Sequence, residues 1–238
     1  MRRRSPGVRR VDEFFGSEQV GTGIDAEFAI AALEPLVTLE RRERLLEVIA
    51  ARLDSVTVLM DAPHDPHNGG AVVRSCDAFG VQRLHVVERT ERFLASMTVS
   101  RGSEKWVDVH TYDEAYAAAE RLEREGHEFI ATAPGGDLVP EDLSQIARPV
   151  LVIGNERQGI AGDLRERCKR AVRVPMRGFI DSLNLSVSTA ILLAAAVRGR
   201  NGDLAPEERR RLYARGLYLT ASRAAEVLFE AKKSARYP

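Results

Sequence analysis

Short apolar runs alternate with amphipathic stretches through the middle of the chain. Residues 56–60 and 150–153 are almost continuously apolar, which is typical of strands buried on both faces of a parallel sheet. Between such runs, apolar residues recur at helical spacing, and two of the helical stretches end at Gly80 and Gly126. The pattern predicts strands over residues 56–60, 84–87, 106–109, 129–133, 150–153 and 172–174, and helices over residues 68–79, 113–125, 160–169 and 185–197.

This alternation predicts an α/β fold, with a mostly parallel sheet covered by helices on both faces. The flanking segments have only helical patterns. Residues 39–53 carry leucine and isoleucine at helical spacing, and a second helical region follows the break at residues 201–203. We therefore predict a helical N-terminal extension over residues 1–54, an α/β domain over 55–200 and a helical C-terminal extension over 201–238.

Composition narrows the class of protein. The chain has 238 residues, of which 44% are apolar and 29% charged, as in globular proteins. Its 35 basic and 35 acidic residues cancel, so bulk charge does not indicate a nucleic-acid partner. Two cysteines make no disulfide scaffold and suit a reducing cytosol. No apolar run reaches the length of a membrane span, so we expect a cytoplasmic protein without membrane contact.

Positive charge gathers at both ends of the chain. Residues 1–10 contain five arginines and no acid, and residues 207–238 contain eight basic and four acidic residues. Such clusters are either solvated ends or a surface that binds nucleic-acid phosphates. The candidate phosphate-binding residues are Arg2, Arg3, Arg4, Arg9, Arg10, Arg209, Arg210 and Arg211.

Ligands of parallel sheets bind at loops beyond the carboxyl ends of the strands. After the first predicted strand, Asn68 is placed to cap a helix, and Arg74 lies off that helix's apolar stripe. Arg74 is then either an exposed residue paired with Asp77 or part of a site. The nearby histidines have no zinc-site spacing, so we predict no metal.

Two later loops also carry polar residues. Glu156 lies between Gly154 and Gly159, where a carboxylate would repel phosphate and suits a hydroxyl or amino group of a ligand. No Gly-x-Gly-x-x-Gly follows a strand, which excludes a dinucleotide-binding fingerprint. Ser182 and Asn184 precede the most apolar helix, and Ser182 is the predicted N-cap.

Together these stretches resemble the three motifs of the TrmH (SpoU) family of RNA ribose 2′-O-methyltransferases, within the SPOUT superfamily. The first motif corresponds to residues 67–80, the second to residues 152–156 with Gly159, and the third to residues 174–176 with 182–188. Residues 102–106 match a further family stretch, and the likeness covers about residues 40–200. Three motifs in this order are far more specific than any one of them.

The resemblance implies a deep trefoil knot near the C-terminal part of the α/β domain. It also implies that S-adenosylmethionine binds in the knotted loops and that the protein is a homodimer whose active site forms across the subunit interface. The positions implied for the cofactor are Thr132, Ala133, Gly154, Val174, Met176 and Leu183.

The catalytic set implied by the resemblance is Asn68, Arg74, Glu156, Ser182 and Asn184. The family's proposed general base corresponds to Arg74, but a guanidinium is effectively never deprotonated in proteins. Arg74 is better suited to hold a phosphate or to stabilise the developing alkoxide. Asn68 would then position Arg74 or the ribose. Ser182 and Asn184 would hold the reacting groups, and Glu156 would orient the loop or the partner subunit.

The N-terminal flank indicates the substrate. Family members that methylate large-subunit ribosomal RNA typically carry a further, ribosomal-protein-like domain there. This helical segment, with Arg41 at the start of a basic helix, instead resembles the short arm of the tRNA guanosine enzymes. We therefore expect 2′-O-methylation of the D-loop guanosine at tRNA position 18. A ribosomal RNA substrate and a non-catalytic RNA-binding protein are the alternatives. Asp181 and Gln158 depart from the family pattern beside the motif cores.

Overall fold

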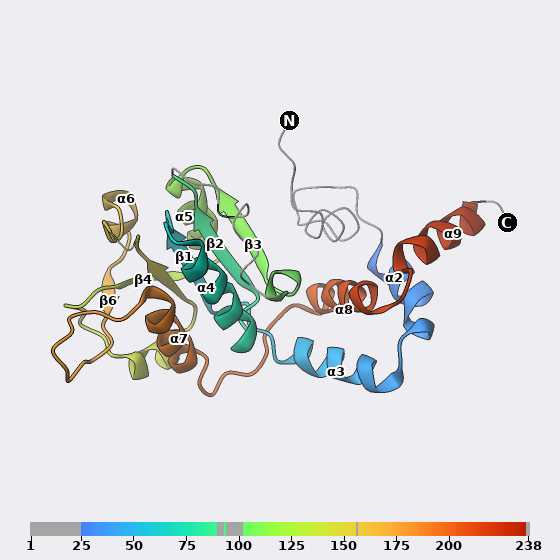
Figure 1. Cartoon of the computed structure of the whole chain (residues 1–238), viewed down its shortest axis with the longest axis horizontal. Helices are drawn as coiled ribbons and strands as arrows, with labels where there is room; N and C mark the ends of the chain where they lie inside the picture. The colour runs from blue at the N-terminus through green and yellow to red at the C-terminus, as the bar shows by residue number, and fades with distance from the viewer. Residues whose placement is uncertain (1–24, 90–92, 94–101, 156, 237–238) are drawn as a thin grey trace. The chain divides into compact units, whose positions relative to one another are not determined.

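The computed structural model describes residues 25–89, 93, 102–155 and 157–236, which Figure 1 traces in colour. The five arginines of residues 1–10 and Glu156 lie outside this range. The chain forms two compact units. One is Leu53–Asn201, and the other is a helical unit that combines the described parts of Met1–Arg52 and Gly202–Pro238.

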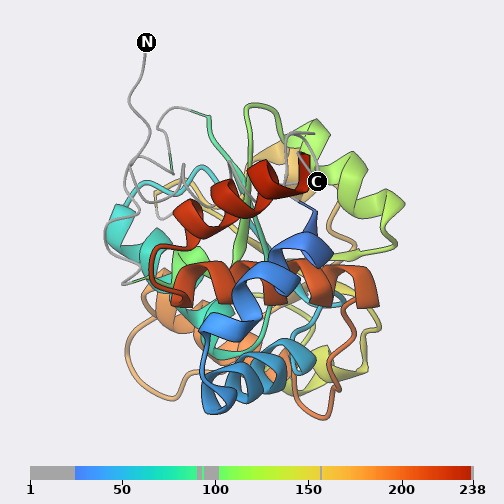
Figure 2. The same cartoon turned by 90° about the vertical axis from the view of Figure 1, so that its right-hand side faces the viewer.

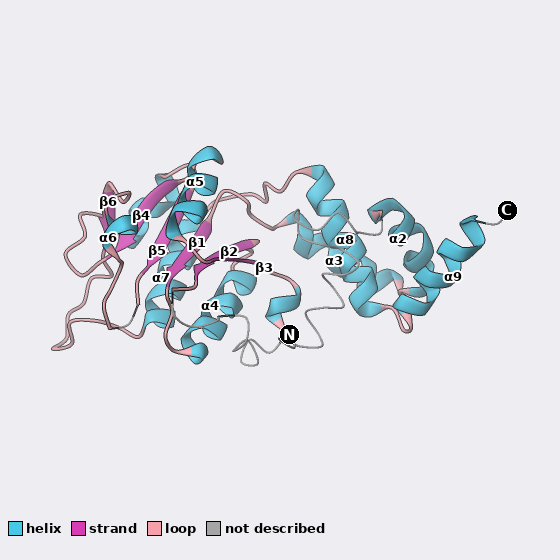
Figure 3. Cartoon of the chain, turned by 90° about the horizontal axis from the view of Figure 1, so that it is seen from above, coloured by secondary structure: helices cyan, strands magenta, loops and turns pink. Residues whose placement is uncertain are grey.

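Six parallel strands form the sheet of the larger unit, in the order β3-β2-β1-β5-β4-β6, and Figure 3 shows them from above. Their bounds are β1 Thr57–Asp61, β2 Arg83–Val87, β3 Asp108–Tyr112, β4 Glu128–Thr132, β5 Pro149–Ile153 and β6 Arg170–Val172. Every residue of the two central strands β1 and β5 is buried. The predicted α/β fold with a parallel sheet is therefore confirmed.

Helices cover both faces of the sheet, because successive side chains of a strand point to opposite sides. Val58 and Met60 pack in one core with helices α4 (Pro66–Ala78) and α7 (Leu185–Ala196). Leu59, between them in sequence, packs in a second core with α5 (Ala115–Arg124) and α6 (Gly162–Arg165). The 3₁₀ helix η4 (Pro140–Gln145) contacts α7 on the first face.

Two helices have N-caps other than those predicted. Helix α4 begins at Pro66, and its cap is Asp65, whose carboxylate accepts a 2.8 Å hydrogen bond from the backbone N–H of His67. Helix α7 is capped by Asn184 rather than Ser182, since the Asn184 side-chain oxygen accepts a 2.8 Å hydrogen bond from the N–H of Ser186. The backbone conformation of the preceding loop decides which side chain reaches the first turn.

Three other boundaries also differ from the prediction. The helix predicted over residues 160–169 is only the short α6, because the chain turns after it to enter β6. The strands predicted over residues 106–109 and 172–174 are displaced to β3 and β6. Their bounds follow from pairing with β2 and β4, which a local apolar pattern does not reveal.

The helical unit brings together segments from both ends of the chain, as Figure 2 shows. It consists of the helices α2 Ala26–Leu33, α3 Leu39–Ala50, α8 Pro206–Thr220 and α9 Ala224–Arg236, with a short 3₁₀ helix η1 Glu34–Leu36. Gly216 of α8 lies so close to α3 that a Cβ atom there would be 2.8 Å from Cδ2 of Leu45. The hydroxyl of Tyr213 donates a 2.7 Å hydrogen bond to the Glu34 carboxylate. None of the helices in the described part of the chain has the length and apolar character needed to cross a membrane.

The segment after β6 returns the chain to elements that precede it. Residues 173–184 lead from β6 to α7, and α7 packs against α4 and η4. The trefoil knot that the resemblance implies concerns this return, and it stays a prediction.

Candidate functional site

A cavity of about 540 Å³ lies at the carboxyl ends of β4, β5 and β6. Thr132, Ile153 and Val172 contribute from the ends of these strands, and the loops that follow them form the walls. Side chains near the starts of α4 and α7 complete the lining. This is the edge at which parallel sheets bind ligands, and pockets for small molecules typically measure roughly 300–1,000 Å³.

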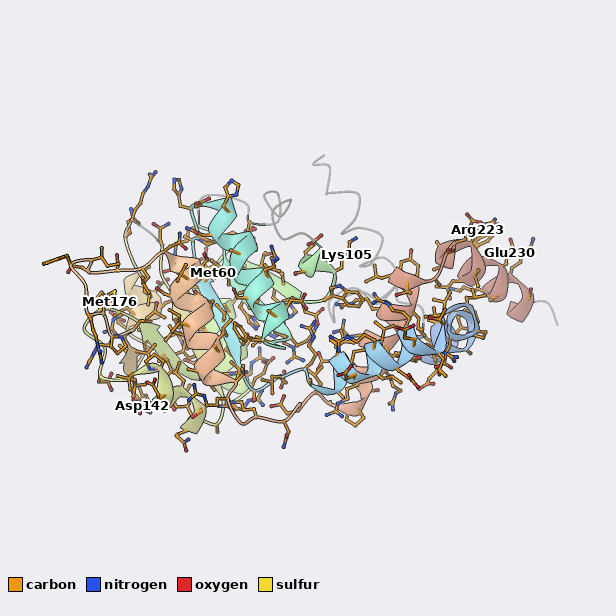
Figure 4. The ribbon with its side chains drawn as sticks, turned by 60° about the horizontal axis from the view of Figure 1, so that its bottom comes forward. Met60, Lys105, Asp142, Met176, Arg223 and Glu230 are labelled. Atoms are coloured by element: carbon orange, nitrogen blue, oxygen red, sulfur yellow. The ribbon has the colours of Figure 1, made fainter. Side chains whose placement is uncertain are left out.

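The structure gathers all the positions implied for the cofactor around this cavity. Thr132, Ala133, Gly154, Val174, Met176 and Leu183 line it. Met176 lies on the segment between β6 and α7 (Figure 4). Ile153, Ile160 and Leu185 add apolar side chains to the lining. Loop backbone and apolar side chains together suit a ligand with a flat ring and polar edges.

The loop after β5 is a tight turn that requires glycine. A Cβ atom on Gly154 would lie 2.3 Å from the carbonyl carbon of Gly159, so no larger residue fits there. Gly159 has a φ of +71°, in the left-handed region that favours glycine. The backbones of Asn155 and Gly159 exchange hydrogen bonds of 2.9 and 2.8 Å. The side-chain oxygen of Asn155 accepts a 2.8 Å hydrogen bond from the N–H of Arg157.

The loop after β4 is held against β6. The N–H of Ala133 donates a 3.0 Å hydrogen bond to the carbonyl of Val172, and the guanidinium of Arg173 donates to the carbonyl of Gly136. A Cβ atom on Gly136 would lie 2.6 Å from the carbonyl oxygen of Ala171. These contacts hold the loop after β4 and the segment after β6, which both line the cavity, against each other.

Three of the residues implied for catalysis lie at the cavity. Asn68, Ser182 and Asn184 all line it. Nδ2 of Asn184 donates a 2.9 Å hydrogen bond to Oδ1 of Asn68, across 116 residues of sequence. Asn68 is buried, whereas Ser182 and Asn184 are exposed. The pair therefore joins the starts of α4 and α7 at the edge of the cavity.

Arg74 lies apart from Asn68, Ser182 and Asn184 of the same chain. It is exposed on α4, and it is not among the described residues that line the cavity. Six residues of helix place it about 9 Å beyond Asn68 along the axis. No position is described for Glu156, the fifth residue of the set.

The predicted RNA-binding arginines of the helical unit differ in their surroundings. The side chain of Arg209 donates hydrogen bonds of 2.9 and 3.2 Å to the carbonyls of Leu204 and Gly202, so it holds the turn before α8. Arg210 pairs with Glu27 at 3.2 Å, and Arg211 pairs with Glu208 at 3.5 Å. Arg41 is exposed on α3.

A charged group beside the cavity was not predicted as part of a site. Asp61 ends β1, and its carboxylate accepts hydrogen bonds from Arg89 and from the backbone of Ala161. Arg89 also donates to Asp163, and this hydrogen bond lowers the pKa of the Asp163 carboxyl. The available signal was an acidic residue at the end of a buried strand.

The described residues contain no candidate metal site. No three His, Cys, Asp or Glu side chains there are grouped so that they could hold a metal ion.

Sequence comparison identifies close relatives. The SpoU rRNA Methylase family matches residues 55–194. A tRNA (guanosine(18)-2′-O)-methyltransferase of Thermus thermophilus is 34% identical over 164 residues, which cover 68% of this chain and 84% of the relative. An Escherichia coli protein of the same name is 30% identical over 208 residues, which cover 83% of this chain and 89% of the relative.

Solved structures agree with this assignment. The TrmH/SpoU tRNA modifying enzyme of Aquifex aeolicus aligns with a TM-score of 0.65 at 30% identity, covering 76% of this chain and 96% of that one. The SpoU methyltransferase AviRb of Streptomyces viridochromogenes, solved in complex with the cofactor AdoMet, aligns with a TM-score of 0.56 at 29% identity, covering 64% and 60%. The resemblance found in the three motifs is thus confirmed, and the chain belongs to the SpoU methylase family of S-adenosylmethionine-dependent RNA methyltransferases.

Proposed function

We propose that this protein transfers the methyl group of S-adenosylmethionine to the ribose 2′-hydroxyl of guanosine 18 in the D-loop of tRNA. The observation that carries the proposal is the joining of Asn68 and Asn184 at the edge of the cavity that is lined by all the implied cofactor positions. Relatives named for this reaction align over 84–89% of their own length at 30–34% identity, which favours tRNA over ribosomal RNA.

The residues present fit the cofactor. S-adenosylmethionine supplies an electrophilic methyl group when it is bound. The cavity offers apolar side chains, such as Ile153, Ile160 and Leu183, that can flank a purine ring. The glycine turn at Gly154 brings backbone N–H and carbonyl groups to the lining, where no side chain has room. Both features suit a nucleoside with a polar tail.

The side chains around the cavity have separate roles in the proposed reaction. The Asn68–Asn184 pair fixes the start of α7 and presents an amide to the substrate, and Ser182 contributes a hydroxyl beside it. Arg74 keeps its proton, so it binds the phosphate next to the target ribose or stabilises the charge that develops on the 2′-oxygen. Glu156 orients the loop after β5 or contacts the partner subunit.

We propose a homodimer with the active site at its interface. Val187 and Ile191 lie on one face of α7 and are 47% and 37% exposed, and Phe179 and Ile180 on the preceding loop are exposed as well. An exposed apolar face of this kind is suited to a two-fold contact with a second copy. Arg74 does not line the cavity of its own chain, so a site completed by the partner accounts for its position.

We further propose that the helical unit binds tRNA phosphates, together with the arginines of residues 1–10. Arg41 is exposed, Arg210 forms a surface ion pair with Glu27, and Arg211 pairs with the half-buried Glu208. An exposed pair such as Arg210–Glu27 contributes little to stability, so phosphate can replace its carboxylate at low cost. Arg209 is tied to two backbone carbonyls and contributes to this surface mainly by holding the turn before α8. A tRNA substrate also favours a cytoplasmic location.

The proposal is tested by incubating the protein with labelled S-adenosylmethionine and unmodified transcripts. We expect label in tRNA and none in ribosomal RNA. Label in ribosomal RNA alone would show that the substrate is ribosomal RNA and not tRNA. An absence of label in both, with RNA binding retained, would identify a non-catalytic RNA-binding protein.

A further inference from the structure

Asp61 connects three segments of the sheet's carboxyl edge. It is 2% exposed. Its Oδ1 atom accepts a 2.7 Å hydrogen bond from Nε of Arg89, which follows β2. Its Oδ2 atom accepts a 2.8 Å hydrogen bond from the backbone N–H of Ala161, which follows the glycine turn after β5. The guanidinium of Arg89 continues to Asp163 at the start of α6, at 2.7 Å.

A buried carboxylate is costly unless it is paired and hydrogen-bonded. Asp61 meets this condition by using both oxygens, one on a charged donor and one on a backbone donor. Burial opposes the charge of Arg89, but its hydrogen bonds to Asp61 and Asp163 outweigh this and raise the pKa of the guanidinium. The backbone amide of Ala161 thus donates to a carboxylate that is also paired with a guanidinium, and such a charge-assisted bond is stronger than a bond between neutral groups.

The other end of the same turn is held by the neighbouring residue. Nδ2 of Asn155 donates a 2.6 Å hydrogen bond to the carbonyl of Ala62. Ala62 has a φ of +48°, an uncommon conformation for a residue with a side chain, and it aims this carbonyl at the turn. Residues 61 and 62 thus hold the turn at both Asn155 and Ala161. Gly154, which precedes Asn155, and Gly159 and Ile160, which precede Ala161, line the cavity.

We infer that Asp61 is a positioning residue for S-adenosylmethionine binding, which acts by holding Ala161 and through it the wall formed by Gly159 and Ile160. The inference rests on the proposed cofactor cavity. Neither the aspartate nor Arg89 lines the cavity among its described residues, so the effect on the ligand is transmitted through the loop.

Two substitutions test the contact from opposite sides. Asp61→Asn keeps the size of the side chain and removes its charge. Ala161→Pro removes the donor N–H and places the ring Cδ where the hydrogen was, and the φ of −64° at Ala161 is one that proline adopts. The matched control is Asp54→Asn. Asp54 lies just before the other end of β1 and binds two arginines, Arg83 and Arg148, away from the cavity.

The readouts are S-adenosylmethionine affinity by calorimetry, tRNA affinity and melting temperature. We expect Asp61→Asn and Ala161→Pro to weaken cofactor binding at least about tenfold, the effect of losing a hydrogen bond to a charged group. Affinity for tRNA should not change. Asp54→Asn should lower the melting temperature comparably and keep cofactor affinity within about twofold of wild type. The inference is overturned if both test variants bind the cofactor like wild type, or if the control weakens binding as much as they do.

A cavity variant distinguishes failure of this inference from failure of the proposed site. Leu183→Glu places a charge in the cavity wall. If it abolishes cofactor binding while Asp61→Asn and Ala161→Pro leave binding unchanged, the cavity stands and the positioning role is wrong. If Leu183→Glu binds the cofactor normally, the proposed cofactor cavity is wrong.

Discussion

The side chains of Asn184 and Asn68 share a 2.9 Å hydrogen bond that joins the first turns of α7 and α4. Asn184 uses its amide nitrogen for this contact and its oxygen to cap α7. The Asn184 side chain therefore both caps α7 and contacts Asn68, and substitutions can separate these two roles.

Asn184→Ser should retain the cap and lose the contact with Asn68, because serine caps helices as well as asparagine but is too short to span the gap. We expect methyl transfer to fall about 100-fold, as when one positioned polar group is removed from an active site. Stability should change little. Asn184→Ala should lose as much activity and about 1 kcal/mol of stability in addition. Urea unfolding and single-turnover assays measure the two effects, and full activity in Asn184→Ser would show that the contact with Asn68 is dispensable.

Arg74→Ala should abolish methyl transfer and leave cofactor binding nearly intact, because Arg74 lies on α4 away from the cavity lining. Arg74→Lys should also fail, since an ammonium lacks the planar fork that binds phosphate in two places. Calorimetry with S-adenosylmethionine provides the check. A collapse of cofactor affinity in Arg74→Ala would contradict the assignment of Arg74 to the RNA.

Ile191→Glu should convert the protein to monomers and abolish activity, because it places a charge in the apolar face of α7 proposed to meet the second copy. Ile191 is already 37% exposed, so the single chain should remain folded. Leu46→Glu, at an exposed leucine of α3, is the control and should leave the mass unchanged. Sedimentation that finds a stable, active monomer of the unaltered protein at micromolar concentration would refute the dimer.

Stability should decrease as pH falls below about 6.5, the value for an unperturbed histidine. Burial, helped by the charge of Arg148, lowers the pKa of His127 to about 4, and burial holds the pKa of His85 well below its usual range. The unfolded chain takes up protons that the folded chain refuses, so stability is full above pH 6.5 and is lost progressively toward pH 4. Each histidine contributes up to about 1.4 kcal/mol per pH unit. Urea titrations between pH 7 and 5 should show a shallower loss in His127→Gln, and an identical slope would exclude His127 as a source.

Binding of tRNA should weaken steeply with salt, and Arg41→Ala should reduce the log–log slope by about 0.7–0.9, the value for one lost phosphate contact. Removal of residues 1–10 should reduce it further. Arg209→Ala should instead lower the melting temperature, because its guanidinium holds the carbonyls of Leu204 and Gly202. Equal slopes for the intact and altered proteins would mean that these arginines touch no phosphate.

The sequence predicted those features that depend on local pattern. Continuous apolar runs identify β1 and β5 because both strands are buried on both faces. The family resemblance, rather than a local pattern, implied Gly154, Met176 and Leu183, which line one cavity. The caps at Asp65 and Asn184 were missed because they depend on the loop backbone. The role of Asp61 was missed because its partners, Arg89 and Ala161, are distant in sequence and meet only at the sheet edge.

The packing of the two helical flanks into one unit was likewise beyond local pattern. Gly216 permits α8 to approach Leu45 of α3, a contact between opposite ends of the chain. An isolated glycine in a helix lowers local helix propensity and does not reveal its partner.

The most direct test of the proposed function is the position of the methyl group on tRNA. A tRNA transcript with guanosine at position 18 is compared with one that differs only by 2′-deoxyguanosine there, using labelled S-adenosylmethionine and mass spectrometry of the digested product. We expect one methyl group per tRNA, on the 2′-oxygen of guanosine 18, and none on the deoxy substrate. Equal labelling of the two transcripts, or a methyl group on a base, would contradict it.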